Sequence, residues 1–142
     1  MHEVDKPEHL NTSSLRWFEM FFKPVFAEEE LLSGVSWVDV RDVAEAHVVA
    51  LEKEDVANER IIVSAPAVAN QEFIEAAKRA AAELGIKGVQ TGVSNYDPAG
   101  PVRAVRFSDA KMNKLLGIKI TSVDDSVRDT IANFRERGWI PT

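Results

Sequence analysis

The sequence contains only three short runs with the character of β-strands, and each is followed by a stretch with helical periodicity. The runs are residues 37–40, 60–64 and 104–107. The second holds a continuous β-branched stretch, which is typical of a strand buried on both faces of a parallel sheet. Alternating strands and helices predict an α/β fold. Because an average sheet has about five or six strands, we expect only a small lobe, with two or three short strands and about five helices.

Capping residues and glycines mark the expected ends of the helices. Helices are predicted over residues 15–22, 43–53 and 71–84, between Ser108 and Gly117, and between Thr121 or Ser122 and Gly138. One of Thr12, Ser13 and Ser14 is expected to cap the first helix. Asp42, with Glu45 three residues later, is expected to cap the second. Asn70 is expected to cap the third.

One apolar stripe in the second predicted helix is expected to face the core. It consists of Val43, His47 and Leu51. His47 is therefore interpreted as a hydrogen-bonded core histidine in preference to a ligand or a catalytic group.

The composition excludes several classes of function. The chain has no cysteine, so it has neither disulfides nor thiolate chemistry, and this is typical of a reducing compartment. The net charge of −6 argues against a nucleic-acid partner. No apolar run approaches the roughly 20 residues that span a bilayer, and residues 1–10 are too polar for a secretory leader. We expect residues 1–142 to form a single domain of a cytoplasmic protein without a membrane segment.

Asp39 and Asp42 are the most notable carboxylates, because a strand followed by a helix places them near the edge of an α/β sheet where sites lie. The alternative, which we favour, is that Asp42 caps the helix and Asp39 pairs with Arg41 or another neighbour. Arg103 and Arg106 flank the third strand and face either an anionic ligand or, as we favour, water. We expect no metal site. The glycines after the third helix fit turns better than a nucleotide loop: Gly85, Gly88 and Gly92.

A longer motif carries a family resemblance. The segment from Trp37 to His47 reads W-V-D-V-R-D-V-A-E-A-H. It resembles the V-D-V-R-D-V-A-x-A-H signature of extended short-chain dehydrogenases/reductases, of the NAD-dependent epimerase/dehydratase superfamily. The branch is that of dihydroflavonol reductases and fungal carbonyl or methylglyoxal reductases. Further similar segments follow in the family's order: R-I-I-V-S, F-S-D-A-K, L-L-G and S-V-D-D-S-V. The resemblance covers nearly the whole chain, but only the C-terminal, substrate-binding half of the family.

The resemblance implies that a full member carries a Rossmann domain ahead of these residues. That domain supplies a glycine-rich loop and a Tyr-x-x-x-Lys pair, and this chain has neither. Its only tyrosine, Tyr96, is followed four residues later by Gly100 instead of lysine. We therefore expect no catalytic residue in these 142 residues, and whether the chain is an enzyme stays open. NADP is the cofactor that the family implies, and we expect none to bind this chain alone.

Carried over by motif, the family's substrate-lining positions correspond to Ser36 and Trp37, and its cofactor-binding positions to Ser13 and Ser14. The loop over residues 87–102 is expected to shape the substrate pocket together with Trp37. The implied partners are a small carbonyl substrate and the Rossmann domain. Without that domain, we expect self-association through the apolar helix Leu15–Phe22.

Two hypotheses follow. In the first, the chain is the substrate-binding portion of an NADP-dependent oxidoreductase that reduces aldehydes or ketones, and it is inactive alone. In the second, it is a stand-alone, non-catalytic binding or oligomerisation module derived from that lobe.

Overall fold

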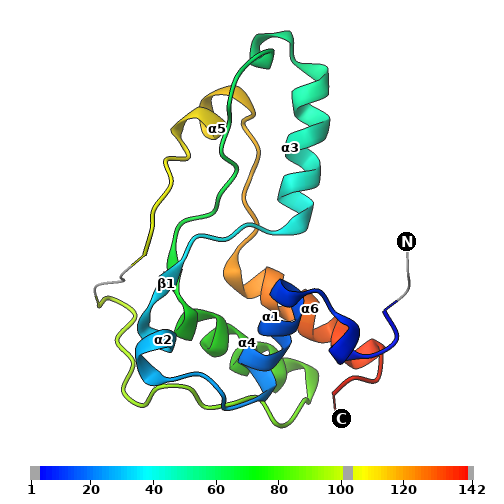
Figure 1. The fold of residues 1–142 in the computed structure, drawn as a ribbon, viewed down its shortest axis with the longest axis vertical. Helices are drawn as coiled ribbons and strands as arrows, with labels where there is room; N and C mark the ends of the chain where they lie inside the picture. Colours follow the sequence, from blue (N-terminus) through cyan, green and yellow to red (C-terminus); the bar gives the residue numbers. More distant parts are fainter. Residues whose placement is uncertain (1–3, 101–103, 141–142) are drawn as a thin grey trace.

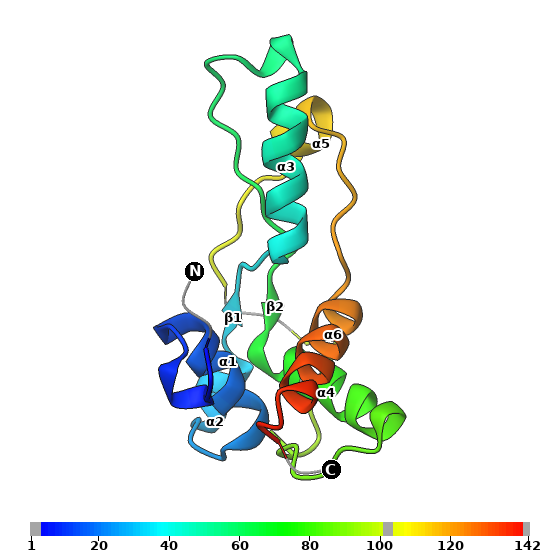
Figure 2. The same ribbon diagram turned by 90° about the vertical axis from the view of Figure 1, so that its right-hand side faces the viewer.

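A computed structural model describes residues 4–100 and 104–140, which form two lobes, one beyond the other (Figures 1 and 2). The basal lobe comprises residues 4–35, 68–100 and 122–140, and the distal lobe comprises residues 40–63 and 104–121. In chain order the elements are η1 (Pro7–His9), α1 (Thr12–Phe22), α2 (Glu28–Leu32), β1 (Gly34–Val35), α3 (Val40–Glu52), η2 (Glu54–Val56), β2 (Val68–Ala69), α4 (Asn70–Leu84), α5 (Ala110–Leu115) and α6 (Val123–Glu136). The small α/β lobe expected from the sequence is confirmed.

Aromatic contacts hold the basal lobe together. Phe73 of α4 is fully buried and contacts Trp17 of α1, with ring centroids 4.8 Å apart. Phe18 of α1 meets Phe134 of α6 nearly edge-on at 5.3 Å. Pairs of this geometry add about 0.5–1.5 kcal/mol beyond the burial itself. Since Phe21 is also fully buried, the apolar side chains of α1 are largely used inside this chain's own core.

The distal lobe packs α3 against a small apolar cluster. Its buried members are Ala46, Val56, Met112, Leu116 and Ile118. The inner face of α3 thus carries small side chains, which let the extended residues 61–63 pack close to the helix. The predicted stripe is wrong for this reason: Leu51 is 89% exposed, and His47 is exposed with Nδ1 2.7 Å from the carbonyl oxygen of Val43.

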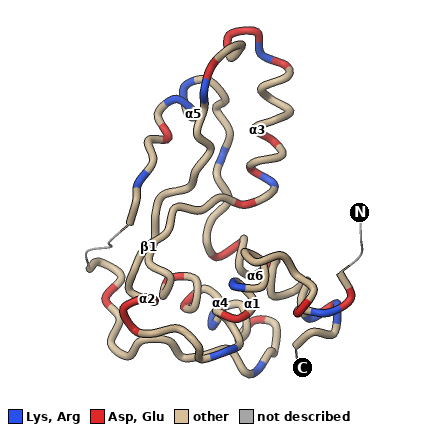
Figure 3. Tube along the Cα trace, viewed as in Figure 1, with Lys and Arg blue, Asp and Glu red and all other residues tan. Residues whose placement is uncertain are grey.

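The only sheet among the described residues is a two-stranded antiparallel pair at the junction of the lobes. Gly34 pairs with Ala69 and Val35 with Val68. The segment that leads from the distal lobe into β2, residues 61–69, carries no charged side chain (Figure 3).

None of the three predicted strands is a strand in the described residues. Val40 already belongs to α3, and residues 60–64 and 104–107 lie outside any strand. A β-branched run sets the tendency to extend, but a strand also requires the hydrogen bonds of a neighbour. Arg103 and residues 101–102 of the predicted loop lie outside the described residues.

Several predicted helix starts are also wrong. Asn11, not Thr12, Ser13 or Ser14, caps α1 by accepting the N–H of Ser14 at 2.9 Å. Asp39, not Asp42, caps α3. The α4 cap expected at Asn70 is not formed, because its side-chain amide donates instead to the Glu30 carbonyl, 2.9 Å away. The cap at Ser122 and the left-handed glycines that end the helices are confirmed: Gly85, Gly117 and Gly138.

Asp42 joins the lobes. Its carboxylate is 2% exposed, and it accepts the Thr121 N–H at 2.9 Å and the Thr121 hydroxyl at 2.6 Å. Thr121 directly precedes the Ser122 cap of α6. A buried carboxylate therefore fixes the start of α3 against the start of α6.

We expect Asp42→Ala to destabilise the fold by about 1–3 kcal/mol, because it leaves two partly buried donors of Thr121 unpaired. Urea unfolding followed by tryptophan fluorescence measures this loss. In a double-mutant cycle with Thr121→Ala, the combined loss is expected to be smaller than the sum of the two single losses. Glu45→Ala, which removes an exposed carboxylate of the same helix, serves as the control and stays within about 0.5 kcal/mol of wild type. Strictly additive losses would contradict the coupling.

Candidate functional site

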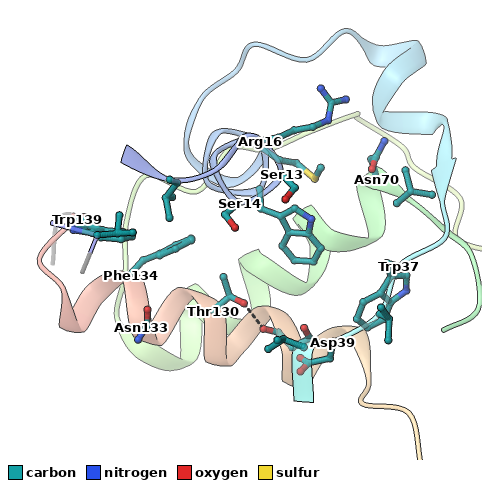
Figure 4. A pocket seen from close by; sticks show the side chains of 18 of the residues that line it. Ser13, Ser14, Arg16, Trp37, Asp39, Asn70, Thr130, Asn133, Phe134 and Trp139 are labelled. Atoms are coloured by element: carbon teal, nitrogen blue, oxygen red, sulfur yellow. Dashed lines mark hydrogen bonds between the residues drawn. The ribbon is translucent and has the colours of Figure 1, made fainter. Parts of the chain in front are cut away.

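A cleft of about 1090 Å³ lies in the basal lobe, next to the junction. Its walls come from the start of α1, from residues 35–39 and from one face of α6 (Figure 4). A cleft of this volume is at the upper end of the range of small-molecule sites.

All four residues carried over by the family resemblance line this cleft. Ser13 and Ser14 enter it from α1, and Ser36 and Trp37 from the segment after β1. These pairs lie more than twenty residues apart in sequence. The structure therefore brings the predicted cofactor residues and the predicted substrate residues to one hollow. Their roles stay predictions.

Trp37 is held by contacts on two sides. Its indole N–H donates to the Pro66 carbonyl at 3.2 Å, and its ring meets Phe73 edge-on, with centroids 5.6 Å apart and planes at 89°. Its own carbonyl accepts the N–H of Ala65 at 2.8 Å. The half-buried indole is thus a fixed apolar wall of the cleft.

The hydroxyl groups of the cleft differ in availability. Ser13 donates to the side-chain oxygen of Asn11 at 2.9 Å, and Ser36 donates to the carbonyl of Val105. Thr130 donates to the Ser126 carbonyl at 2.7 Å. The hydroxyl of Ser14 has no such partner among the described residues and is the one best placed to meet a ligand.

The face of α6 supplies lining residues that the sequence reasoning missed. They are Ser126, Thr130, Asn133 and Phe134. The polar members sit beside the buried stripe formed by Val127 and Ile131. Their positions in the sequence could have indicated this role, because polar residues next to the apolar stripe of a helix lie at the edge of its buried surface.

Asp39 lines the cleft but is already fully engaged. It accepts the backbone N–H of Arg41 and two bonds from the Arg41 guanidinium, each at 2.9 Å. Arg41 also donates to Asp129 of α6 at 2.6 Å. These bonds hold the pKa of Asp39 well below its usual range and raise the pKa of Arg41. The structural interpretation of Asp39 as an ion-paired residue is confirmed, and this carboxylate is not a free base.

The loop over residues 87–102 was expected to line this cleft together with Trp37. Its described residues, 87–100, do not line it. Residues 91, 93–96 and 98 of this loop line a separate, smaller hollow beside α4. Gln71, fully buried, accepts the Val93 N–H at 2.9 Å and ties the loop to α4. Gly92 (φ 68°) lies so close to the Gln71 amide that a side chain there would collide with it.

Tyr96 lies in this second hollow and not in the cleft. Its hydroxyl donates to Glu72 at 2.7 Å. Burial, together with the Glu72 carboxylate, raises the pKa of Tyr96 above its ordinary value of 10.0. A phenol held this firmly in its protonated form is poorly suited to donate a proton to a substrate.

Neither a metal site nor a membrane-spanning helix occurs among the described residues. No group of three or more acidic or histidine side chains is arranged to hold a metal ion there. None of the helices described is long and apolar enough to cross a membrane.

Several known proteins are similar to this chain. No family model matches. The NADPH-dependent methylglyoxal reductase GRE2 of Saccharomyces cerevisiae is 31% identical over 136 residues, which are 94% of this chain and 39% of that protein. A putative NADPH-dependent methylglyoxal reductase of Candida albicans, GRP2, is 27% identical over 93% of this chain and 38% of its own length. The chain therefore spans about two fifths of the curated relatives it matches.

Solved structures agree. The structure of Gre2 from Candida albicans in complex with NADPH matches 90% of this chain and 37% of that protein, with a TM-score of 0.71 and 30% identity. The yeast Gre2–NADPH complex matches 72% of this chain, with a TM-score of 0.63 and 25% identity.

The class of protein that these matches define is the NADPH-dependent reductases. The homologues of this chain are methylglyoxal reductases of the extended short-chain dehydrogenase/reductase family, so the resemblance in the sequence is confirmed. The share of the relatives that it matches is consistent with a C-terminal part of such a protein.

The low pKa of Asp39 predicts a pH dependence of stability. A carboxylate whose pKa is lowered by folding stabilises the fold above its unfolded pKa, and this contribution is lost as the pH falls towards the folded pKa. We expect the free energy of unfolding to decrease below about pH 4. Asp39→Asn keeps an oxygen for the α3 cap but removes the charge, and it should therefore flatten this decrease. Urea unfolding at several pH values measures it.

The matched control is Asp55→Asn, an exposed carboxylate at the far end of the distal lobe. It should leave the acid limb of the stability curve unchanged. An Asp39→Asn curve parallel to that of wild type would show that the ion pair with Arg41 contributes nothing to acid sensitivity.

Proposed function

We propose that this chain is the substrate-binding portion of an NADPH-dependent reductase of aldehydes or ketones. The observation that supports this most directly is the convergence of Ser13, Ser14, Ser36 and Trp37 on one cleft. The names of the relatives point to the same chemistry.

The proposed division of labour follows from the reaction. Reduction of a carbonyl needs a hydride on the carbon and a proton on the oxygen. When bound, NADPH supplies the hydride and leaves as NADP⁺. The proton must come from a positioned acid, and neither Asp39, which is ion-paired and deprotonated, nor Tyr96, which lies outside the cleft, fits that role. We therefore infer that the chain alone is inactive and that a Rossmann domain supplies the acid.

The start of α1 suits the role proposed for Ser13 and Ser14. The first N–H groups of a helix have no intrahelical acceptor and favour an anion. Asn11 occupies only the Ser14 N–H and the Ser13 hydroxyl. The Ser14 hydroxyl and the earlier N–H groups are left for an oxygen of the cofactor diphosphate. In the same proposal, Trp37 is the apolar wall against which the carbon chain of the substrate packs.

The second candidate function is a non-catalytic binding or oligomerisation module. It is favoured by the exposed apolar side chains of α3, among them Leu51, which suit contact with another polypeptide. The cysteine-free sequence fits the cytoplasm under either proposal.

Isothermal titration of NADPH into the purified chain tests the division of labour. At protein concentrations on the order of 100 µM, we expect no detectable heat, because any Kd much above a millimolar escapes detection. Saturable binding would mean that these residues build a nucleotide site by themselves and would contradict the proposal. The yeast reductase, titrated under the same conditions, is the positive control.

A chimaera tests the role of Trp37. The part of the yeast reductase that this chain does not match is fused to this chain, and kcat/KM is measured for a series of aldehydes and ketones. Trp37→Ala should change the preference between bulky and small substrates by roughly tenfold, the worth of one lost apolar contact. The KM for NADPH should change less. Trp139→Ala, at the other end of the cleft, should preserve the ranking. An unchanged ranking for Trp37→Ala would remove this residue from the substrate pocket.

A further inference from the structure

One end of the cleft is lined by the last turn of α6 and by the residues that follow it. Asn133, Arg137 and Trp139 contribute to this lining. Figure 4 shows Asn133 and Trp139 at the end of the cleft opposite Trp37. Since the cleft of about 1090 Å³ is larger than a small carbonyl compound beside Trp37 would fill, this end is open to a second group of the ligand.

The exposed side chain of Arg137 is held in place at this end without a carboxylate partner. Its Nε donates to the side-chain oxygen of Asn133 at 2.9 Å, and its Nη1 donates to the Val4 carbonyl at 3.1 Å. Its guanidinium lies over the Trp139 ring, 5.1 Å from the ring centroid. Among the described residues, no acidic side chain pairs with Arg137, and its Nη2 group has no acceptor. The guanidinium is therefore fixed in position with one edge and its positive charge unused.

Capping of α6 does not account for this side chain. Arginines in the last turn of a helix commonly bind the last carbonyl groups of that helix. In α6, those carbonyls already accept the backbone N–H groups of residues 137–139, at 2.9–3.1 Å. The bonds to Asn133 and Val4 use two of the N–H donors of Arg137. The remaining donors are available to a ligand in the cleft.

Asn133 adds a further donor beside Arg137. Because its side-chain oxygen accepts the Nε–H bond of Arg137, its amide nitrogen is left to donate, and no acceptor meets that nitrogen among the described residues. Arg16, the other arginine that lines the cleft, is already paired with Glu30. The end of the cleft beside α6 thus combines N–H donors with an unpaired positive charge, which is the chemistry that recognises carboxylate and phosphate groups.

We propose that Arg137 and Asn133 form an anion subsite of the cleft, which holds a carboxylate or phosphate group of the bound ligand. The Nη2 group and the second N–H bond of Nη1 can bind two oxygens of such a group at once. A carboxylate would belong to the substrate, which would then be an oxo acid, and a phosphate would belong to the cofactor. The choice between these sources rests on the proposed function, whereas the subsite itself rests on the contacts of Arg137 and Asn133.

A nuclear magnetic resonance titration of the purified, ¹⁵N-labelled chain tests the subsite independently of activity. Sodium phosphate and sodium succinate are the probes, added at constant pH and ionic strength because salt screens exposed charges. We expect saturable shifts of the side-chain N–H signals of Arg137 and Asn133, with a Kd on the order of millimolar. Followed at Asn133, Arg137→Gln should weaken binding of both probes about fivefold or more. The control is Arg79→Gln, at an exposed arginine that pairs with Asp124 outside the cleft, and it should bind like wild type.

A second variant keeps Arg137 in place, and it decides the test if Arg137→Gln does not fold. Asn133→Asp retains an oxygen for the Nε–H bond of Arg137 but places a negative charge beside the guanidinium. We expect it to fold like wild type and to lose the saturable shifts, because its charge repels the anion. Equal phosphate and succinate binding by wild type and by the folded variants would overturn the proposal.

The chimaera with the unmatched part of the yeast reductase distinguishes the two sources of the anion. We measure kcat/KM for 4-oxobutanoate and for its uncharged methyl ester. If the subsite holds a substrate carboxylate, Arg137→Gln should lower the acid-to-ester ratio about fivefold and leave the KM for NADPH unchanged. If it holds a cofactor phosphate, the ratio should stay constant and the KM for NADPH should rise.

An Arg137→Gln chimaera that changes neither quantity would overturn the proposal, even where the chain alone binds phosphate. An inactive wild-type chimaera would contradict the proposed function instead. The titration of the chain alone then decides whether the anion subsite exists, so the two failures are distinguishable.

Discussion

The arrangement of this protein depends on two buried carboxylates at the junction of its lobes. Asp42 binds the backbone and hydroxyl of Thr121, and Asp39 is clamped by Arg41, which reaches on to Asp129 of α6. Both carboxylates sit at the start of α3, and both connect it to α6. Buried charges are tolerated only where donors satisfy them, so the relative position of the two helices is closely defined.

This junction also fixes the segment after β1, which carries the family signature, beside the cleft. Trp37 precedes the clamped Asp39 by two residues, and its carbonyl is tied to Ala65. The ion pair therefore fixes the backbone from which the indole projects. Asp39 lines the cleft, but its lone pairs face Arg41. The segment thus positions Trp37 as a wall of the cleft.

Sequence reasoning predicted five of the described α-helices and their glycine stops, because apolar periodicity and left-handed glycines are local properties; it missed the short α2. It also placed four residues that meet in one cleft, although this came from a family motif. It failed at strands and caps, which depend on partners. Asn70 bonds to Glu30, forty residues earlier, instead of capping its own helix. His47 was assigned to the wrong face because the side of α3 that packs on the distal cluster carries Ala46, Val49 and Ala50, and alanines contribute little to an apolar stripe.

The misplaced strand is the most informative of these differences. Local sequence gives residues 60–64 the side chains of an interior strand, and the structure gives them the extended course and one covered face, yet no neighbour. A chain whose local preference and global structure disagree at one segment is either strained or incomplete there. Strain has no support in this segment, since the positive φ values of non-glycine residues occur only at Asn58 and Asn95 among the described residues. The same lobe exposes apolar side chains of α3, so apolar surface and backbone groups of the distal lobe have no partner among the described residues.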